Sequence, residues 1–164
     1  MFRSEIGRDF VLIEPNLPWH KPIAVNKDWG EAKFQLLADH LLKDGFDVVQ
    51  MLYTDYYQGS KRRLNRVRYI HTPTFRHALA VLSRAKFAVL PEGGLHHGAA
   101  ALDILAVVLF GGCAPPEVLG YDFHFNLTGR EPEACGSRTW CRHCNEAMRR
   151  ISAEEVYQLC VGNL

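Results

Sequence analysis

The fold is decided by the stretch Val89-Leu90-Pro91-Glu92-Gly93-Gly94-Leu95-His96-His97-Gly98-Ala99-Ala100-Ala101. It begins inside an apolar, β-branched run, Phe87–Leu90, which predicts a buried strand that Pro91 ends. The small residues from Gly98 onward predict a helix able to lie close against a sheet. A strand joined to a helix through a glycine-rich turn is typical of parallel α/β sheets. The free N–H groups at the start of such a helix suit an anion.

Strands and helices alternate along the rest of the chain. Ser152 and Glu155 have the spacing of a capping box before a short C-terminal helix. The order of elements predicts an α/β fold with a mostly parallel, Rossmann-like sheet and helices on both faces. Further strands are expected at Phe10–Glu14, Phe46–Leu52, Val67–Ile70 and Val107–Phe110, and helices at Glu31–Lys43, after Thr74 with Phe75, Ala78, Leu79 and Leu82 on its buried face, and at Gly94–Leu105.

Length and composition predict one domain over residues 1–164, with a cysteine-rich segment at 135–144. A net charge of +1 and 48% hydrophobic residues argue against a disordered tail or a general polyanion-binding surface, so nucleic acid is not an expected partner. The N-terminus has no secretory signal pattern. Because no apolar run approaches the roughly 20 residues of a membrane span, a cytoplasmic protein is predicted.

Two loops are expected to face each other at one edge of the sheet. In parallel sheets ligands bind beyond the carboxyl ends of the strands, where both the loop containing Lys27 and the Glu92 turn lie. A diphosphate between them would meet the Lys27 ammonium, the amides of Gly93, Gly94 and Leu95, and the imidazole of His97. The plainer interpretation makes Lys27 a solvated charge and His97 an ordinary helix residue. His96 points about 100° from His97 on a helix, which favours a structural role for it.

Three segments together resemble the C-terminal, donor-binding half of glycosyltransferase family 9, the ADP-heptose:lipopolysaccharide heptosyltransferase family. That family has an Asp-Ser/Thr-Gly-x-x-His turn, and here Glu92-Gly93-Gly94-Leu95-His96-His97 matches it, with Glu92 in place of the aspartate. The family's Lys-x-Trp element is matched by Lys27-Asp28-Trp29, and its Phe-Gly turn and proline-containing loop by Phe110-Gly111-Gly112 and Ala114-Pro115-Pro116.

The resemblance implies a GT-B glycosyltransferase domain that binds a nucleoside diphosphate sugar, such as ADP-heptose. Lys27 and His97 would then be catalytic, with Lys27 neutralising the departing diphosphate, and Glu92 would contact the sugar. Family members also have an acceptor domain with a catalytic acid, and the resemblance implies that these 164 residues do not include it. Transfer would therefore need a partner chain, a homodimer, or an acid of this domain such as Glu14. Alternatives are a non-catalytic nucleotide-sugar sensor and a metal-stabilised interaction protein.

A second motif, Cys135-x5-Cys141-x2-Cys144, has metal-ligand spacing. A Cys-x-x-Cys turn aims two thiolates at one ion, and a tetrahedral zinc or iron site needs four ligands. Some family 9 relatives that modify autotransporters hold a cysteine-bound iron in a comparable segment. The alternative is five reduced, buried cysteines of a cytosolic protein. Candidates for the fourth ligand are His143, Cys113, His124 and Cys160, and water or a group from a partner is a further alternative.

Basic residues cluster in one further segment, between the second and third predicted strands. Such a run is usually a solvated loop, but it could also attract an anionic substrate. No regular set of aromatic side chains accompanies it, as a single-strand nucleic-acid binder would require. The cluster consists of Lys61, Arg62, Arg63, Arg66 and Arg68.

Overall fold

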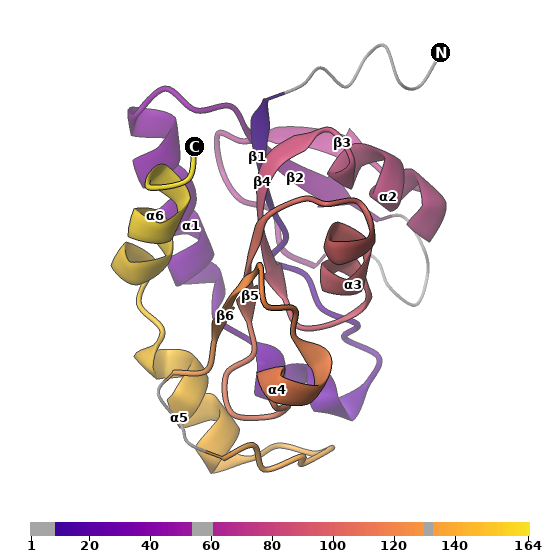
Figure 1. Cartoon of the computed structure of the whole chain (residues 1–164), viewed down its shortest axis with the longest axis vertical. Coiled ribbons are helices and arrows are strands. Elements are labelled where there is room, and N and C mark those ends of the chain that lie inside the picture. The colour runs from indigo at the N-terminus through magenta and orange to yellow at the C-terminus, as the bar shows by residue number, and fades with distance from the viewer. Residues whose placement is uncertain (1–8, 54–60, 130–132) are drawn as a thin grey trace.

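The structure, a computed structural model, describes residues 9–53, 61–129 and 133–164. Its centre is a sheet of six parallel strands in the order β3-β2-β1-β4-β5-β6, with helices on both faces (Figure 1). The predicted α/β, Rossmann-like fold is thereby confirmed. The strands are β1 (Phe10–Ile13), β2 (Val48–Leu52), β3 (Arg68–His71), β4 (Ala85–Pro91), β5 (Ala106–Leu109) and β6 (Phe125–Leu127).

Alternation along the central strands divides the core into two layers. Val11 and Ile13 of β1 pack on one face of the sheet, with Phe34, Leu37 and other residues of α1 (Glu31–Lys43) and of α6 (Ala153–Val161). Phe10 and Leu12 pack on the other face with α2 (Phe75–Leu82) and α3 (Gly94–Ala101). Because side chains of a strand point alternately to opposite faces, one apolar strand serves both layers.

Local signals fix several helix ends. α1 has the predicted bounds, and Gly45 follows it with a φ of 86°, which glycine adopts without strain. The Thr74 hydroxyl accepts a hydrogen bond from the His77 N–H at the start of α2, and the Ser152 hydroxyl accepts one from the Glu155 N–H at the start of α6. The predicted N-caps are therefore confirmed.

Other expectations about the helices were wrong. Phe75 is 54% exposed rather than buried, because it is the first residue of α2 and lies over the start of α3. α3 ends at Ala101 rather than Leu105, since the chain turns at Asp103 with a φ of 55° and leads directly into β5. Several short elements were not predicted: the 3-10 helix η1 (Pro22–Lys27), α4 (Pro116–Leu119), β6 and α5 (Arg142–Arg150).

In the part of the chain that the structure describes, no helix has the length and apolar character needed to cross a membrane.

Trp29 joins the region of η1 to the C-terminal helices. Its indole is 3% exposed and lies edge-on to the Phe34 ring, with the ring centroids 4.8 Å apart. Its Nε1–H donates to the Ile151 carbonyl at 2.8 Å, between α5 and α6. Lys33 donates to the same carbonyl and to those of Met148 and Arg149 at the end of α5. These contacts hold the C-terminal segment against α1.

Trp29→Phe should lower the free energy of unfolding by about 1–2 kcal/mol, because it removes a buried hydrogen bond and part of a packed ring. Urea unfolding followed by circular dichroism measures the change. Trp140→Phe is the matched control, since Trp140 is 65% exposed and should change stability by less than about 0.5 kcal/mol. Equal effects of the two substitutions would contradict the structural role of Trp29.

Candidate functional site

A cavity of about 220 Å³ lies where β1, β2 and β4 end. This is the edge at which parallel α/β sheets bind ligands. The segment after β1 contributes Asn16 and Lys21, the end of β2 contributes Tyr53, and α2 contributes the exposed ring of Phe75. The turn after β4 provides the remaining wall with residues Pro91, Glu92, Gly93, Gly94 and Leu95.

Lys27 and Glu92 form an ion pair beside this cavity. Lys27 is the last residue of η1, and Glu92 directly follows β4. Their side chains are only 14% and 7% exposed. β1 and β4 are neighbours in the sheet, so the loops that follow them meet at its edge, as the sequence predicted. A Lys ammonium in this place could also contact an incoming phosphate, because it offers three donors.

The start of α3 presents backbone donors to the same cavity. As the first two residues of the helix, Gly94 and Leu95 have no intrahelical partner for their N–H groups. The Gly93 N–H donates instead to His96 Nδ1 at 2.9 Å. Of the three amides predicted to meet a phosphate, the Gly93 amide is thus already engaged. A Cβ at Gly93 would meet no atom within 4 Å, so the space beside this residue is open.

The two adjacent histidines differ in role. His96 is fully buried and bridges the Gly93 N–H and the Leu119 carbonyl, which it contacts at 2.8 Å through Nε2. Burial lowers its pKa, and a neutral ring can accept at Nδ1 while donating at Nε2. His96 thus has the structural place expected of it. His97 is exposed, and its Nδ1 lies 3.0 Å from the Tyr121 hydroxyl. It is not among the residues that line the cavity.

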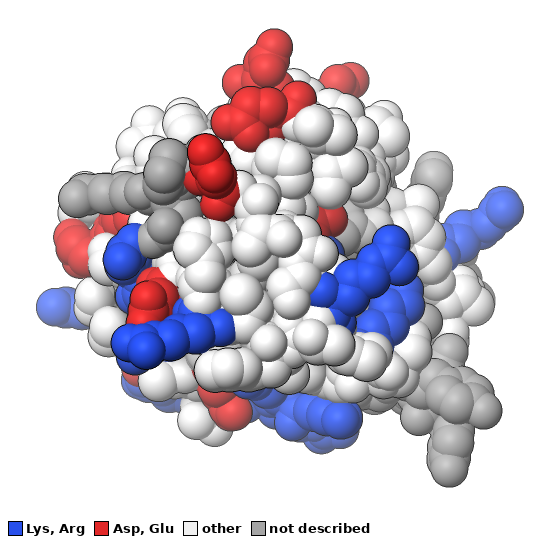
Figure 2. All heavy atoms as spheres, turned by 90° about the horizontal axis from the view of Figure 1, so that it is seen from below, with Lys and Arg blue, Asp and Glu red and all other residues white. Residues whose placement is uncertain are grey.

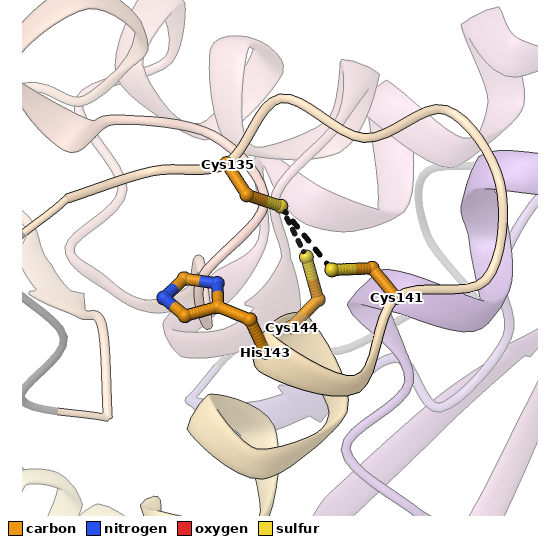
Figure 3. Close-up of side chains that lie close together, drawn as sticks. All are labelled: Cys135, Cys141, His143 and Cys144. Atoms are coloured by element: carbon orange, nitrogen blue, oxygen red, sulfur yellow. Dashed lines mark hydrogen bonds between the residues drawn. The ribbon is translucent and has the colours of Figure 1, made fainter.

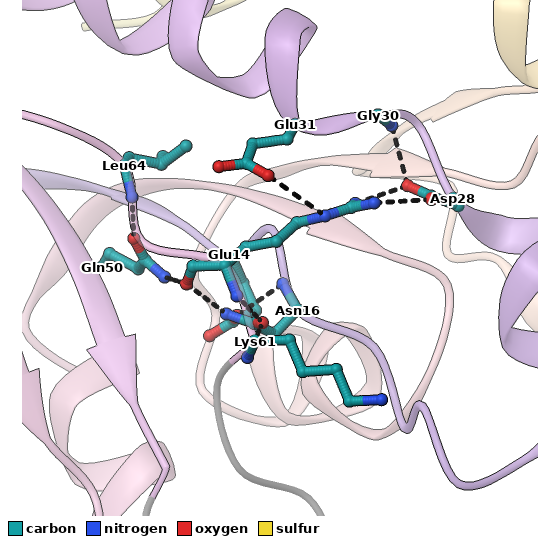
Figure 4. A network of polar contacts seen from close by, with 9 residues as sticks. Glu14, Asn16, Asp28, Gly30, Glu31, Gln50, Lys61 and Leu64 are labelled. Atoms are coloured by element: carbon teal, nitrogen blue, oxygen red, sulfur yellow. Dashed lines mark hydrogen bonds and ion pairs between the residues drawn. The ribbon is translucent and has the colours of Figure 1, made fainter.

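A network of hydrogen bonds next to the cavity joins Asn16 and Gln50 to the segment before β3 (Figure 4). Asn16 Oδ1 accepts from the N–H groups of Lys61 and Arg62, each at 2.9 Å. The Gln50 side chain, fully buried in β2, donates to the Arg62 carbonyl and accepts from the Leu64 N–H. These bonds attach the segment before β3 to β2 and to the segment that follows β1, where Asn16 lines the cavity.

The basic cluster is largely neutralised by neighbouring acids. Arg62 makes a two-pronged contact with Asp28, at 2.5 and 2.7 Å, and its guanidinium lies 4.7 Å from the centroid of the Trp19 ring. Two further ion pairs join Arg66 to Asp39 and Arg68 to Asp47. These arginines therefore attach their segment to the rest of the domain. Because their charges are paired with acids, the contacts argue against a patch that attracts anions.

Glu14 is a buried carboxyl at the end of β1, 1% exposed. Its Oε1 accepts from the Asn16 N–H at 2.8 Å. Burial raises its pKa to about 8, although hydrogen bonds from Asn16 and the Tyr53 hydroxyl partly offset this. Such a carboxyl is protonated at neutral pH, and it does not line the cavity. This placement does not suit the role of a base that contacts an acceptor.

The four predicted metal-ligating residues come together (Figure 3). One ligand atom from each of Cys135, Cys141, His143 and Cys144 can lie within 4.8 Å of all the others. The Cys135 sulfur is 2.8 Å from that of Cys144 and 3.6 Å from that of Cys141. Three sulfurs and an imidazole nitrogen are the donor set of a tetrahedral zinc or iron site.

Glycines after β5 make room for this cluster. A Cβ at Gly112 would lie 2.8 Å from Cε1 of His143, and one at Gly111 would lie 2.2 Å from the Met148 sulfur. The bare backbone therefore lets α5 pack closely against this turn. The same turn holds the cysteine segment, because the Gly112 carbonyl accepts from the Cys135 N–H at 2.9 Å.

The structure separates the candidates for a fourth ligand. Cys160 belongs to α6 and is buried in the core, and the Nδ1 of His124 accepts from the Ala106 N–H at 3.2 Å, so neither belongs to the cluster. Cys113 lies close by and contacts the Ser137 carbonyl at 3.5 Å. His143 is the candidate that shares one site with the three cysteines.

Some residues of the site were missed in the sequence. Asn16, Tyr53 and Phe75 line the cavity, and each lies within three residues of a strand end or at the first residue of a helix. Polar and aromatic residues directly after strands of a parallel sheet were a usable signal for the first two.

The surface seen from below the view of Figure 1 has basic side chains on two sides of a largely uncharged central region (Figure 2).

Comparison with known proteins shows similarity of fold. No protein-family model matches the sequence. No curated protein matches it either. Solved structures do. The E. coli heptosyltransferase WaaC with ADP is 19% identical, with a TM-score of 0.68, and the match covers 98% of this chain and 46% of that one.

Two other similar structures give the same result. A glycosyl transferase family 9 protein from Veillonella parvula is 16% identical over 98% of this chain and 48% of its own, with a TM-score of 0.69. The dodecameric, iron-containing heptosyltransferase TibC of E. coli, in complex with ADP-D-beta-D-heptose, is 16% identical over 96% of this chain and 47% of its own, with a TM-score of 0.68. The chain thus spans about half the length of these proteins and has the heptosyltransferase-like fold that the sequence motifs indicated.

Glu14→Gln should alter the pH dependence of stability in a defined direction. The folded pKa of about 8 exceeds the unfolded value of 4.5, so folded Glu14 keeps a proton that the unfolded chain loses. Its contribution to stability is therefore complete below pH 4.5 and is lost as the pH rises toward 8. As the pH rises from 5 to 8, the free energy of unfolding of Glu14→Gln should therefore increase relative to that of the wild type by at least about 1 kcal/mol.

Urea unfolding of both proteins at pH 5, 6, 7 and 8 measures this difference. The lowered pKa values of His96 and His124, caused by burial, act in the opposite direction but cancel between the two proteins. Glu117→Gln, at an exposed position, is the matched control. A stability difference for Glu14→Gln that does not change with pH would show that Glu14 is not a buried neutral acid.

Proposed function

We propose that this domain binds a nucleoside diphosphate sugar and supplies the donor site of a glycosyltransferase of the heptosyltransferase type. The observation that supports it most is the meeting of Lys27, Glu92 and the start of α3 at the carboxyl edge of the sheet. A cation, a helix N-terminus and a hydrogen-bonding carboxylate are the groups that a diphosphate joined to a sugar requires. The WaaC and TibC structures, of similar fold, were solved with ADP and an ADP-heptose.

In this proposal each part of the site contacts one part of the donor. The diphosphate lies between the Lys27 ammonium and the Gly94 and Leu95 amides. The nucleoside enters the cavity between Tyr53 and Phe75, whose rings can pack against a base. Glu92 accepts hydrogen bonds from the sugar, and His97 stays a candidate for contact with the phosphates through rotation of its exposed side chain.

The proposed reaction breaks the bond between the anomeric carbon and the diphosphate oxygen. The electron pair stays on the diphosphate, where the positive charge of Lys27 stabilises it. The acceptor hydroxyl forms the new bond to the anomeric carbon and gives its proton to a base. A cavity of about 220 Å³ is smaller than the ~300 Å³ at which drug-sized ligand pockets begin. We therefore assign the acceptor and the base to a second domain, from a partner chain or a second copy.

We further propose that Cys135, Cys141, His143 and Cys144 hold one zinc or iron ion. The four residues fit such an ion in type and spacing. The ion would supply a structural cross-link for the segment 135–144, as metal sites do in other small domains. TibC, which shares the fold, is described as iron-containing. No step of the proposed transfer passes through this ion.

Isothermal titration with ADP, GDP, UDP and CMP, and with sugars linked to them, tests the donor site. We expect one nucleotide to bind, and Lys27→Met to weaken it at least tenfold. Lys27→Met leaves Glu92 buried without its partner, so it should also destabilise the fold by about 1–3 kcal/mol. The double variant Lys27→Met/Glu92→Gln should recover most of this stability but not the affinity.

The double variant separates a binding role from a structural one. Lys43→Met, at an exposed position of α1, is the matched control for loss of a lysine. His97→Ala, compared with His71→Ala at the end of β3, tests the assignment of His97. Lack of binding by any nucleotide to the stable wild-type protein would refute the donor site, and recovery of affinity in the double variant would refute the role of Lys27.

Metal content by inductively coupled plasma mass spectrometry tests the cysteine cluster. After loading with Zn²⁺ or anaerobic Fe²⁺ and gel filtration, we expect one ion per chain. Cys141→Ser and Cys144→Ser should each reduce this to below about 0.2, because each removes one of the four ligands that a tetrahedral site needs. Cys160→Ala is the matched control. Absence of retained metal from the wild type would argue against the site.

Binding without transfer is the alternative function. A sensor or binding module would use the same Lys27–Glu92 site, so titration alone does not separate the two. Addition of a heptosyltransferase acceptor domain with its acceptor does, since only a transferase domain would then consume the nucleotide sugar.

A further inference from the structure

Asn26 connects the two candidate sites. It is the residue before Lys27 in η1, and it is fully buried. Its Nδ2 donates to the carbonyls of Ser137 and Thr139, at 3.0 and 2.6 Å, and its Oδ1 accepts from the Cys141 N–H at 2.9 Å. These three bonds all reach the segment that carries Cys135 and Cys141, more than a hundred residues away in sequence.

The same segment is attached to the strand that supports Glu92. The Gly112 and Cys113 carbonyls, after β5, accept from the Cys135 and Gly136 N–H groups, each at 2.9 Å. The Leu109 carbonyl at the end of β5 accepts from the Glu92 N–H at 3.2 Å. The cysteine segment is thus hydrogen-bonded on one side to Asn26, which precedes Lys27. On the other side it is hydrogen-bonded to the turn after β5, the strand whose last residue accepts from the Glu92 N–H.

The segment itself has little apolar packing to hold it. Cys135, Gly136, Arg138, Thr139 and Trp140 are all exposed. Its position therefore depends on hydrogen bonds and on any link between its cysteines and Cys144 of α5. If the segment moved, the buried amide of Asn26 would lose its hydrogen-bond partners, which is unfavourable. η1 and Lys27 would be expected to move with it.

We propose that an ion at the cysteine cluster and a nucleotide at Lys27 bind cooperatively, with Asn26 as the positioning residue that couples them. This inference rests on the proposed function. The ion fixes the cysteine segment, the segment fixes the side chain of Asn26, and Asn26 fixes η1 with the ammonium of Lys27 next to Glu92. By linkage, the nucleotide must then raise the affinity for the ion by the same factor.

Two measurements on the whole chain test the coupling. The first is the dissociation constant for the best-binding nucleotide, by isothermal titration, in Zn²⁺-loaded and chelator-stripped protein. We expect stripping to weaken nucleotide binding by about fivefold or more, within the usual range of coupling between sites. The second, which needs no nucleotide, is amide hydrogen exchange of the peptide covering residues 22–29. We expect this exchange to slow at least threefold when Zn²⁺ is bound.

Variants locate the coupling at Asn26. Asn26→Ala should still take up Zn²⁺, because the four ligands remain, but stripping should then change the nucleotide affinity less than twofold. Asn145→Ala is the sharper control, since the Asn145 side chain donates to the Cys141 carbonyl at 3.0 Å without touching η1. It should keep the coupling. Asn163→Ala, near the C-terminus, controls for loss of any asparagine.

Each outcome bears on a different statement. If exchange of residues 22–29 responds to Zn²⁺ but no nucleotide binds, the proposed function fails and the coupling of the cysteine cluster to η1 stands. If a nucleotide binds equally well with and without Zn²⁺, the inference is overturned and the proposed function stands. An unchanged coupling in Asn26→Ala would also overturn it, as would failure of the wild type to bind Zn²⁺. Should Asn26→Ala not fold, the wild-type comparison still decides.

Discussion

The ion pair between Lys27 and Glu92 is the constraint on which the arrangement of this edge depends. Both side chains are largely buried, so each charge needs the other close by. The loop after β1 must therefore return across the end of β4, and η1 places its last residue there. Neighbouring strands make this possible, because β1 and β4 pair directly in the sheet. The network of Asn16, Gln50 and Arg62 holds the opposite side of the same edge.

Much of the fold follows from short-range signals. Runs of apolar residues in β1, β4 and β5 are buried on both faces, and the caps Thr74 and Ser152 lie where helices begin. The meeting of the Lys27 loop with the Glu92 turn also followed from the sequence, because the loops that leave the carboxyl ends of parallel strands lie at one edge of the sheet. The ion pair between the two side chains was not predicted. The four-residue cluster could be predicted from Cys-x-x-Cys spacing, although His143 was one of four candidates.

What the sequence did not reveal depends on contacts between distant residues. Asn26 has no local signal for its role, since its partners lie 111 to 115 positions away. Phe75 has the periodicity of a core residue, and only the packing of α2 beside α3 leaves its ring exposed at the cavity. The engagement of the Gly93 amide by His96 is a local contact, but it depends on the rotamer of the His96 ring, which the sequence does not determine.

The segment from residue 133 to 141, all of which the structure describes, explains why a cross-link would matter here. Ala134 and Trp140 are the only apolar residues in it apart from the cysteines, and both are exposed. Burial of apolar surface, the main stabilising effect in folding, is therefore small in this segment. Its hydrogen bonds to Asn26 and to the turn after β5 each contribute only about 1 kcal/mol. An ion bound by four side chains would stabilise it far more, and through Asn26 that order would extend to Lys27.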